Sequence, residues 1–162
     1  MNYKYLLGSI FSIPLLPILY LQGKRIKKEV PDLPEAKGNE GKVYIQHSKP
    51  IKILLIGEST FAGVGVEEHK DGFPGAFAKQ LASHYNRSVS WKVYARSGYN
   101  AKRVNYKILP KIEDQDVDLV LIGLGGNDSF ELNRPNQWKK DIQILIKTCQ
   151  DKFQDGCILK LV

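Results

Sequence analysis

Three short segments of the sequence contain residue types that could together attack a carbonyl group and stabilise the product. Ser59, in the turn 57–60, has a hydroxyl that can act as a nucleophile. Gly98 has no Cβ, so its backbone N–H can come close to a developing oxyanion. Asn127 has a side-chain N–H₂ of the kind found in oxyanion holes, where losing one donor raises the barrier by roughly 3–4 kcal/mol. These residue types suit acyl-transfer chemistry if the fold brings them together.

Each of the three segments follows an apolar stretch that is typical of a buried strand. Strands are predicted at 51–56, 89–95 and 117–122, and a fourth begins at 157. Amphipathic helices are predicted between them, at 73–86, 101–108 and 135–153. Alternating strands and helices indicate an α/β domain with a parallel sheet that helices cover on both faces. Ligands of such sheets bind beyond the carboxyl ends of the strands, which is where the three segments lie.

The same three segments resemble the sequence blocks of the SGNH, or GDSL-type, hydrolases, a family of esterases and lipases. The family's Gly-Asp-Ser block is matched by 57–59, its second-block glycine by Gly98, and its Gly-x-Asn-Asp block by 125–128. The similarity covers about residues 30–162, and the stretches 33–36 and 62–65 resemble a bacterial branch with an N-terminal apolar segment. The resemblance implies a three-layer, flavodoxin-like parallel sheet and cleavage of carboxylic ester or acyl groups without a cofactor.

Each candidate residue also has an ordinary structural interpretation. Ser59 could be a turn or helix-capping residue, Gly98 could fill a turn with positive φ, and Asn127 could form an Asx turn. The order of the blocks, together with the resemblance, favours Ser59 as nucleophile and Gly98 and Asn127 as oxyanion donors. Asp128 is expected to brace its loop, and Asn100 to cap a helix or line the substrate cleft.

The sequence departs from the family pattern at two points. Glu58 replaces the usual Asp, which keeps the charge but lengthens the side chain. The family's C-terminal Asp-x-x-His block is absent, and the chain's three histidines are His47, His69 and His84. All three are expected to be exposed or on an amphipathic helix face, not catalytic. We therefore expect a domain that is incomplete at its C-terminus and a chain that lacks the base and acid needed for turnover.

Two non-catalytic alternatives remain open: a membrane-tethered fragment without activity, and a module that binds an acylated ligand. A nucleotide site is disfavoured because 63–68 does not continue as Gly-x-Gly-x-x-Gly and no Gly-Lys-Ser/Thr occurs. The two cysteines are eight positions apart and the histidines are scattered, so the sequence predicts neither a metal site nor a disulfide framework.

The N-terminal segment 5–21 contains no charged residue and is followed by a basic cluster at 24–28. It favours an uncleaved transmembrane anchor over residues 1–23, with a signal peptide or a buried helix as alternatives. Residues 24–50 are predicted as a linker rich in Pro and Gly, and 51–162 as the hydrolase domain. The positive-inside rule would place that domain in the cytoplasm, with the periplasm as the alternative.

Composition narrows the range of partners. The net charge is +7, with 43% hydrophobic and 25% charged residues, as in ordinary globular chains. No basic stripe interleaved with aromatic residues is present, so nucleic acid is not expected as a partner. The expected partners are a small molecule or lipid bearing an ester or acyl group, and a membrane through the N-terminal helix. The sequence does not predict an oligomeric state.

Overall fold

The computed structural model describes residues 3–29, 31, 33–153 and 157–161. The chain divides into two compact units, Met1–Leu33 and Pro34–Val162. The helices are α1 (Tyr3–Ser12), α2 (Leu16–Glu29), α3 (Phe73–Tyr85), α4 (Ala101–Lys107), α5 (Gly126–Phe130) and α6 (Pro135–Lys152). The strands are β1 (Glu40–Val43), β2 (Ile51–Gly57), β3 (Val89–Ala95), β4 (Leu119–Gly123) and β5 (Cys157–Leu161). Short 3₁₀ turns form η1 (Ile13–Leu15), η2 (His69–Asp71) and η3 (Leu109–Lys111).

The N-terminal unit is helical but interrupted. The turn η1, which contains Pro14, separates α1 from α2, because proline cannot donate the backbone hydrogen bond that a continuous helix needs. Among the described residues, no helix combines the length and the apolar character that crossing a membrane requires. The prediction of a transmembrane helix over residues 1–23 is therefore not supported, and the cytoplasmic placement stays an untested prediction.

The second unit is built on a five-stranded sheet with strand order β1-β3-β2-β4-β5. Strands β3, β2, β4 and β5 run parallel to one another, as the sequence predicts. The chain passes from β2 to β3 on one side and then crosses to β4 on the other side of β2. Strand order therefore reverses at β2, and the crevice at its carboxyl end is where a sheet of this type binds ligands.

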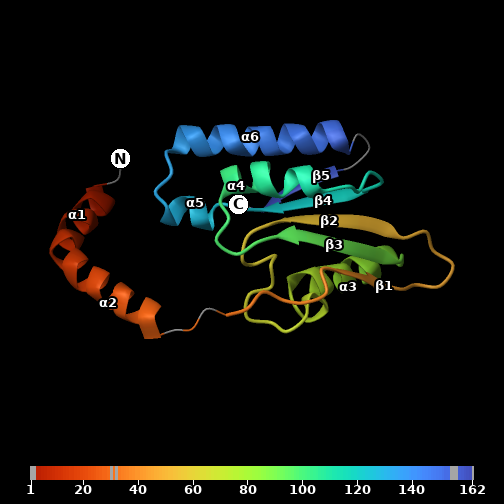
Figure 1. Cartoon of the computed structure of the whole chain (residues 1–162), viewed down its shortest axis with the longest axis horizontal. Helices are drawn as coiled ribbons and strands as arrows, with labels where there is room; N and C mark the ends of the chain where they lie inside the picture. Colours follow the sequence, from red (N-terminus) through yellow and green to blue (C-terminus); the bar gives the residue numbers. More distant parts are fainter. Residues whose placement is uncertain (1–2, 30, 32, 154–156, 162) are drawn as a thin grey trace. The chain divides into compact units, whose positions relative to one another are not determined.

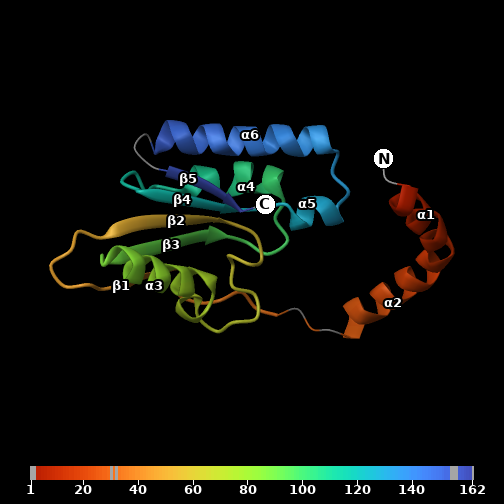
Figure 2. The ribbon, with the colours of Figure 1, turned by 180° about the vertical axis from the view of Figure 1, so that it is seen from behind.

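Helices cover both faces of the sheet, which gives three layers (Figure 1). Helices α4 and α6 pack on one face, where a core forms around Leu54, Ile56 and Leu145. Helix α3 packs on the other face, where Ile53 and Leu55 lie at the centre of a second core (Figure 2). Alternate residues of β2 point to opposite faces, so this central strand is apolar along most of its length. The predicted α/β fold class is confirmed.

The sheet is mixed, not purely parallel, because β1 adds an antiparallel edge strand to β3. The sequence predicts a linker over 24–50 and no strand in this region. In the structure the second compact unit already begins at Pro34. At Gly41 an added Cβ would lie 2.3 Å from the Trp91 ring, so this short strand depends on a glycine. The short helix α5 was also not predicted, since five residues carry no clear periodicity.

A substitution at Leu55 can test how much the packing of the central strand β2 contributes to the stability of the domain. Its side chain is fully buried between β2 and α3. We expect Leu55→Ala to lower the free energy of unfolding by roughly 2–5 kcal/mol, because it leaves a cavity in the core. Urea denaturation measures this change. The control Tyr106→Ala, on a side chain that is 72% exposed, should change it by less than about 0.5 kcal/mol. An equal change in the free energy of unfolding in the two variants would contradict the placement of Leu55 in the core.

Candidate active site

The loops that follow β2, β3 and β4 meet at the carboxyl end of the sheet. The backbone N–H of Glu58 donates to the Gly123 carbonyl at 3.2 Å, and that of Arg96 donates to the Gly57 carbonyl at 3.2 Å. Ser59 lies on the turn directly after β2 and is partly exposed. The structure therefore brings the segments of Ser59, Gly98 and Asn127 to one edge of the sheet, as the sequence predicts.

Close contacts explain why β2 and β4 both end in glycine. An added Cβ at Gly57 would lie 2.6 Å from the Gly123 carbonyl oxygen and 2.7 Å from the Phe61 ring, and one at Gly123 would lie 2.9 Å from the same ring. These two glycines are paired in register across the strands, so Phe61 covers both strand ends. Phe61 is buried and stacks on Phe73 of α3 at a centroid distance of 5.1 Å. The turn that carries Ser59 is thus anchored to the core two residues further along the chain.

The carboxylate of Glu58 connects the nucleophile turn to the third loop. Its Oε1 accepts from the backbone N–H of Gly126 at 2.9 Å. Its Oε2 accepts from the backbone N–H of Asn127 at 3.0 Å and from Asn127 Nδ2 at 2.6 Å. The two backbone groups are among the first N–H groups of α5, which have no partner inside the helix. Glu58 therefore satisfies a helix end and orients the side chain of Asn127.

The side-chain amide of Asn127 is fully engaged in this structure. Besides the bond to Glu58, Nδ2 donates to the Tyr99 carbonyl at 3.0 Å. An amide nitrogen carries two hydrogens, and both are used by these acceptors. An oxyanion would have to replace or share one of them.

The second loop has the backbone conformation that a glycine allows. Gly98 has φ of +76°, and an added Cβ would meet nothing within 4 Å. The need for glycine therefore comes from the positive φ and not from a close approach at Cβ. The space beside Gly98 is open.

A carboxylate from outside the predicted domain fixes the same loop. Glu35 Oε1 accepts from the backbone N–H of Ser97 at 2.7 Å, and Oε2 pairs with Arg96 Nη1 at 3.1 Å. The neighbouring backbone also joins the loop after Ser59, since the N–H of Ala36 donates to the Ala62 carbonyl at 3.0 Å. The segment 34–39, assigned by the sequence to a linker, is thus hydrogen-bonded to two of the three site loops.

The prediction that Asp128 braces its loop is confirmed. Its buried carboxylate accepts from the Ala101 backbone N–H at 2.9 Å and from Asn133 Nδ2 at 3.0 Å. Asn100 caps α4, because its side-chain oxygen accepts from the Arg103 backbone N–H. Its amide nitrogen donates to Glu131, and this bond, with that from Arg103, holds the pKa of Glu131 below its usual range.

None of the three histidines of the chain hydrogen-bonds to Ser59. His47 lies before the amino end of β2 and His84 lies in the last turn of α3, whereas Ser59 follows the carboxyl end of β2. The expectation that His69 is exposed or on a helix face is wrong, because it is 4% exposed. Its ring nitrogens face the carbonyl oxygens of Lys37 and Phe61, each at 3.1 Å. It joins the 34–39 segment to the nucleophile loop.

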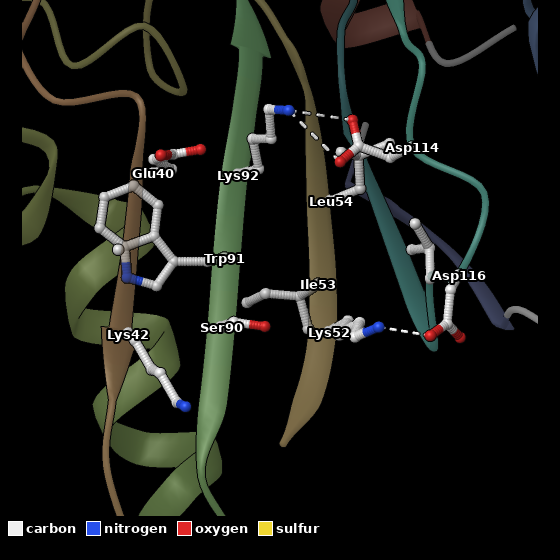
Figure 3. Close-up of a pocket in the computed structure, with 12 residues that line it drawn as sticks. Glu40, Lys42, Lys52, Ile53, Leu54, Ser90, Trp91, Lys92, Asp114 and Asp116 are labelled. Carbon is white, nitrogen blue, oxygen red and sulfur yellow. Dashed lines mark hydrogen bonds and ion pairs between the residues drawn. The ribbon is translucent and has the colours of Figure 1, made fainter. Parts of the chain in front are cut away.

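A groove of about 490 Å³ lies at the other end of the sheet (Figure 3). Three lysines and three acids line it: Lys42, Lys52, Lys92, Glu40, Asp114 and Asp116. Lys52 pairs with Asp116, and Lys92 pairs with Asp114 at 3.3 Å. The hydrogen bond to Asp116 raises the pKa of Lys52. The charges of this groove are balanced, and it lies far from the strand ends that carry Ser59.

Within the described ranges, no group of three or more His, Cys, Asp or Glu side chains is placed to hold a metal ion.

The fold and the arrangement of the loops after β2, β3 and β4 define an α/β protein with the architecture of the SGNH hydrolases. Residues 55–161 match the model of the GDSL-like lipase/acylhydrolase family. The chain belongs to this family.

Solved structures are similar in fold. AlinE4, an SGNH-hydrolase family esterase, has 23% identity and a TM-score of 0.59, over 71% of this chain and 60% of that chain. TesA has 20% identity and a TM-score of 0.58, and the match covers 67% of this chain and 58% of that chain. The psychrotrophic esterase EstA from Pseudoalteromonas sp. has 18% identity and a TM-score of 0.53, and the match covers 67% of this chain and 57% of that chain. The chain therefore spans about 60% of the length of such relatives. A search of curated proteins found no match.

The sequence missed three residues that shape the site: Glu58 as a hydrogen-bond acceptor, Glu35 and Phe61. The pairing of Gly57 with Gly123 at two strand ends is the signal that could have indicated a covering aromatic ring. No local pattern indicates Glu35, because its partners lie about sixty residues further along the chain.

The role of Glu58 can be tested by substitution. We expect Glu58→Ala to lower the free energy of unfolding by about 2 kcal/mol, because three N–H groups lose a charged acceptor. Amide hydrogen exchange at Gly126 and Asn127 should accelerate. The control Glu67→Ala, on an exposed acid of the neighbouring loop, should change neither measurement. Unchanged exchange at Gly126 in Glu58→Ala would show that the carboxylate does not hold this loop.

Proposed function

We propose that the protein is a serine hydrolase that cleaves carboxylic ester or acyl groups. Ser59 would attack the carbonyl carbon. The resulting oxyanion would accept from the backbone N–H groups of Ser59 and Gly98 and from the side chain of Asn127. Membership of the GDSL-like lipase/acylhydrolase family supports this reaction class. The single observation that carries the proposal is the meeting of the three loops at the point where strand order reverses.

The proposed nucleophile needs a partner to remove its proton, as in other serine hydrolases. The three histidines lie elsewhere, and His69 is held between two carbonyl oxygens. We therefore propose Ser59 as the nucleophile and Gly98 and Asn127 as oxyanion donors separately from turnover, which also needs a base.

Adduct formation tests the nucleophile without requiring turnover. A serine hydroxyl adds to butylboronic acid to give a tetrahedral adduct while its proton passes to the buffer, so that the adduct does not require a catalytic base, and ¹¹B NMR detects the change from trigonal to tetrahedral boron. We expect an adduct in the full chain, loss of it in Ser59→Ala, and at least about tenfold weaker binding in Asn127→Ala, since one oxyanion donor is removed.

The matched control is Ser97→Ala, which removes an exposed serine from the neighbouring loop and should leave the adduct unchanged. A tetrahedral signal that persists in Ser59→Ala would place the reactive group elsewhere.

Turnover is expected to be weak. We expect the 162-residue chain to hydrolyse p-nitrophenyl acetate no faster than its Ser59→Ala variant, because loss of the base of a comparable triad costs about a millionfold in rate. The release of p-nitrophenolate measures both rates. Clear hydrolysis that disappears in Ser59→Ala would mean that a residue other than histidine acts as the base.

A module that binds an acylated ligand is the second candidate. The geometry of Asn127 favours this function, because both hydrogens of its Nδ2 are already bound by Glu58 and the Tyr99 carbonyl and neither is free for an oxyanion. Binding of butyl acetate that is equally tight in the parent chain and in Ser59→Ala, with no boronate adduct, would support this function over hydrolysis.

A further inference from the structure

A second groove, of about 450 Å³, adjoins the candidate site on the outer side of β3. It lies where β1 no longer covers β3, between the 34–39 segment and the end of α4 with η3. Three cations from different elements line it: Arg96 after β3, Lys107 at the end of α4, and Lys111 in η3. Its volume is in the range of small-molecule sites.

The charge of this groove is unbalanced, unlike that of the groove in Figure 3. Glu35 is the acid in its lining, and it is already bound to Arg96 and to the Ser97 N–H. Within the described part of the chain, Lys107 and Lys111 form no ion pair. Lys107 Nζ lies 5.6 Å from the centroid of the Tyr99 ring, which also lines the groove. An aromatic surface and uncompensated cations therefore face the same space.

We propose that this groove binds a small organic anion, in which a carboxylate or phosphate group is attached to a compact apolar part. The anionic group pairs with Lys107 and Lys111, and the apolar part packs on Tyr99. Arg96 adds a third cation to the lining of the groove. The ligand contacts the loop 96–100, but its binding requires neither Ser59 nor hydrolysis. Anion binding can therefore be tested independently of the proposed hydrolase function.

The probes are benzyl phosphate and phenylacetate, with benzyl alcohol as the neutral counterpart. Each is titrated into the full chain at low ionic strength, and amide shifts of Ala95, Tyr99 and Ile108 are followed by NMR. We expect saturable binding of at least one anion at these amides, little binding of benzyl alcohol, and weaker binding as salt is added. Phosphate and carboxylate are distinguished by the relative affinities of the two anions.

Substitution locates the site. The double variant Lys107→Gln/Lys111→Gln should weaken anion binding at least about fivefold, as expected for the loss of two partly exposed charge contacts. The control Lys79→Gln/Lys102→Gln removes two exposed charges from α3 and α4 and should leave affinity unchanged. The variant Lys107→Arg/Lys111→Arg keeps both positive charges and should retain anion binding.

Two results would overturn the proposal. Equal weakening by the two glutamine variants would show that only net charge matters. Binding of benzyl alcohol as tight as that of the anions would show that the cations do not recognise the ligand.

Discussion

The carboxylate of Glu58 holds together the parts of the structure on which the candidate site depends. It belongs to the residue before Ser59, yet its acceptor atoms serve the first N–H groups of α5 and the side chain of Asn127. An added Cβ at Gly126 would lie 2.7 Å from this carboxylate, so a larger residue there would displace the Glu58 side chain from its present position. The cost of leaving helix N–H groups without partners, and the attraction of a helix N-terminus for negative charge, both favour this contact. The longer arm of Glu, in place of the family's Asp, is compatible with the role.

The same contact indicates how Asn127 could take part in catalysis. One of its amide hydrogens is bound by a carboxylate and the other by the neutral carbonyl of Tyr99. Hydrogen bonds to charged acceptors are roughly twice as strong as those to neutral ones. An oxyanion that uses Asn127 would therefore replace the Tyr99 carbonyl and leave the bond to Glu58 in place. Such an exchange would require the loop 96–100 to adjust, and this loop also contains Gly98.

The sequence was sufficient for those features that repeat along the chain or mark strand ends. The apolar strands, the three helices between them and the loops of Ser59, Gly98 and Asn127 follow from periodicity and chain order. It was not sufficient for contacts made between distant segments. Strand β1 is too short for a pattern, and its Gly41 packs closely on the Trp91 ring. The buried ring of His69 is held by the carbonyl oxygens of residues 37 and 61. The apolar run 5–21 predicted a transmembrane anchor, but the structure divides this segment into α1 and α2 at the turn η1, which contains Pro14.

The segment 34–39 connects the candidate site to the second groove, which Arg96, Lys107 and Lys111 line. The connection is made by the carboxylate of Glu35. Its two carboxylate oxygens serve different partners, one the Ser97 N–H and the other Arg96. An anion in the groove would compete for Arg96, whose side chain is exposed and whose pairing with Glu35 contributes at most about 1 kcal/mol. The bond to the Ser97 N–H involves a different oxygen and a backbone donor, so it does not depend on Arg96. The groove can therefore take up an anion while the backbone beside Gly98 keeps the hydrogen bond that fixes it.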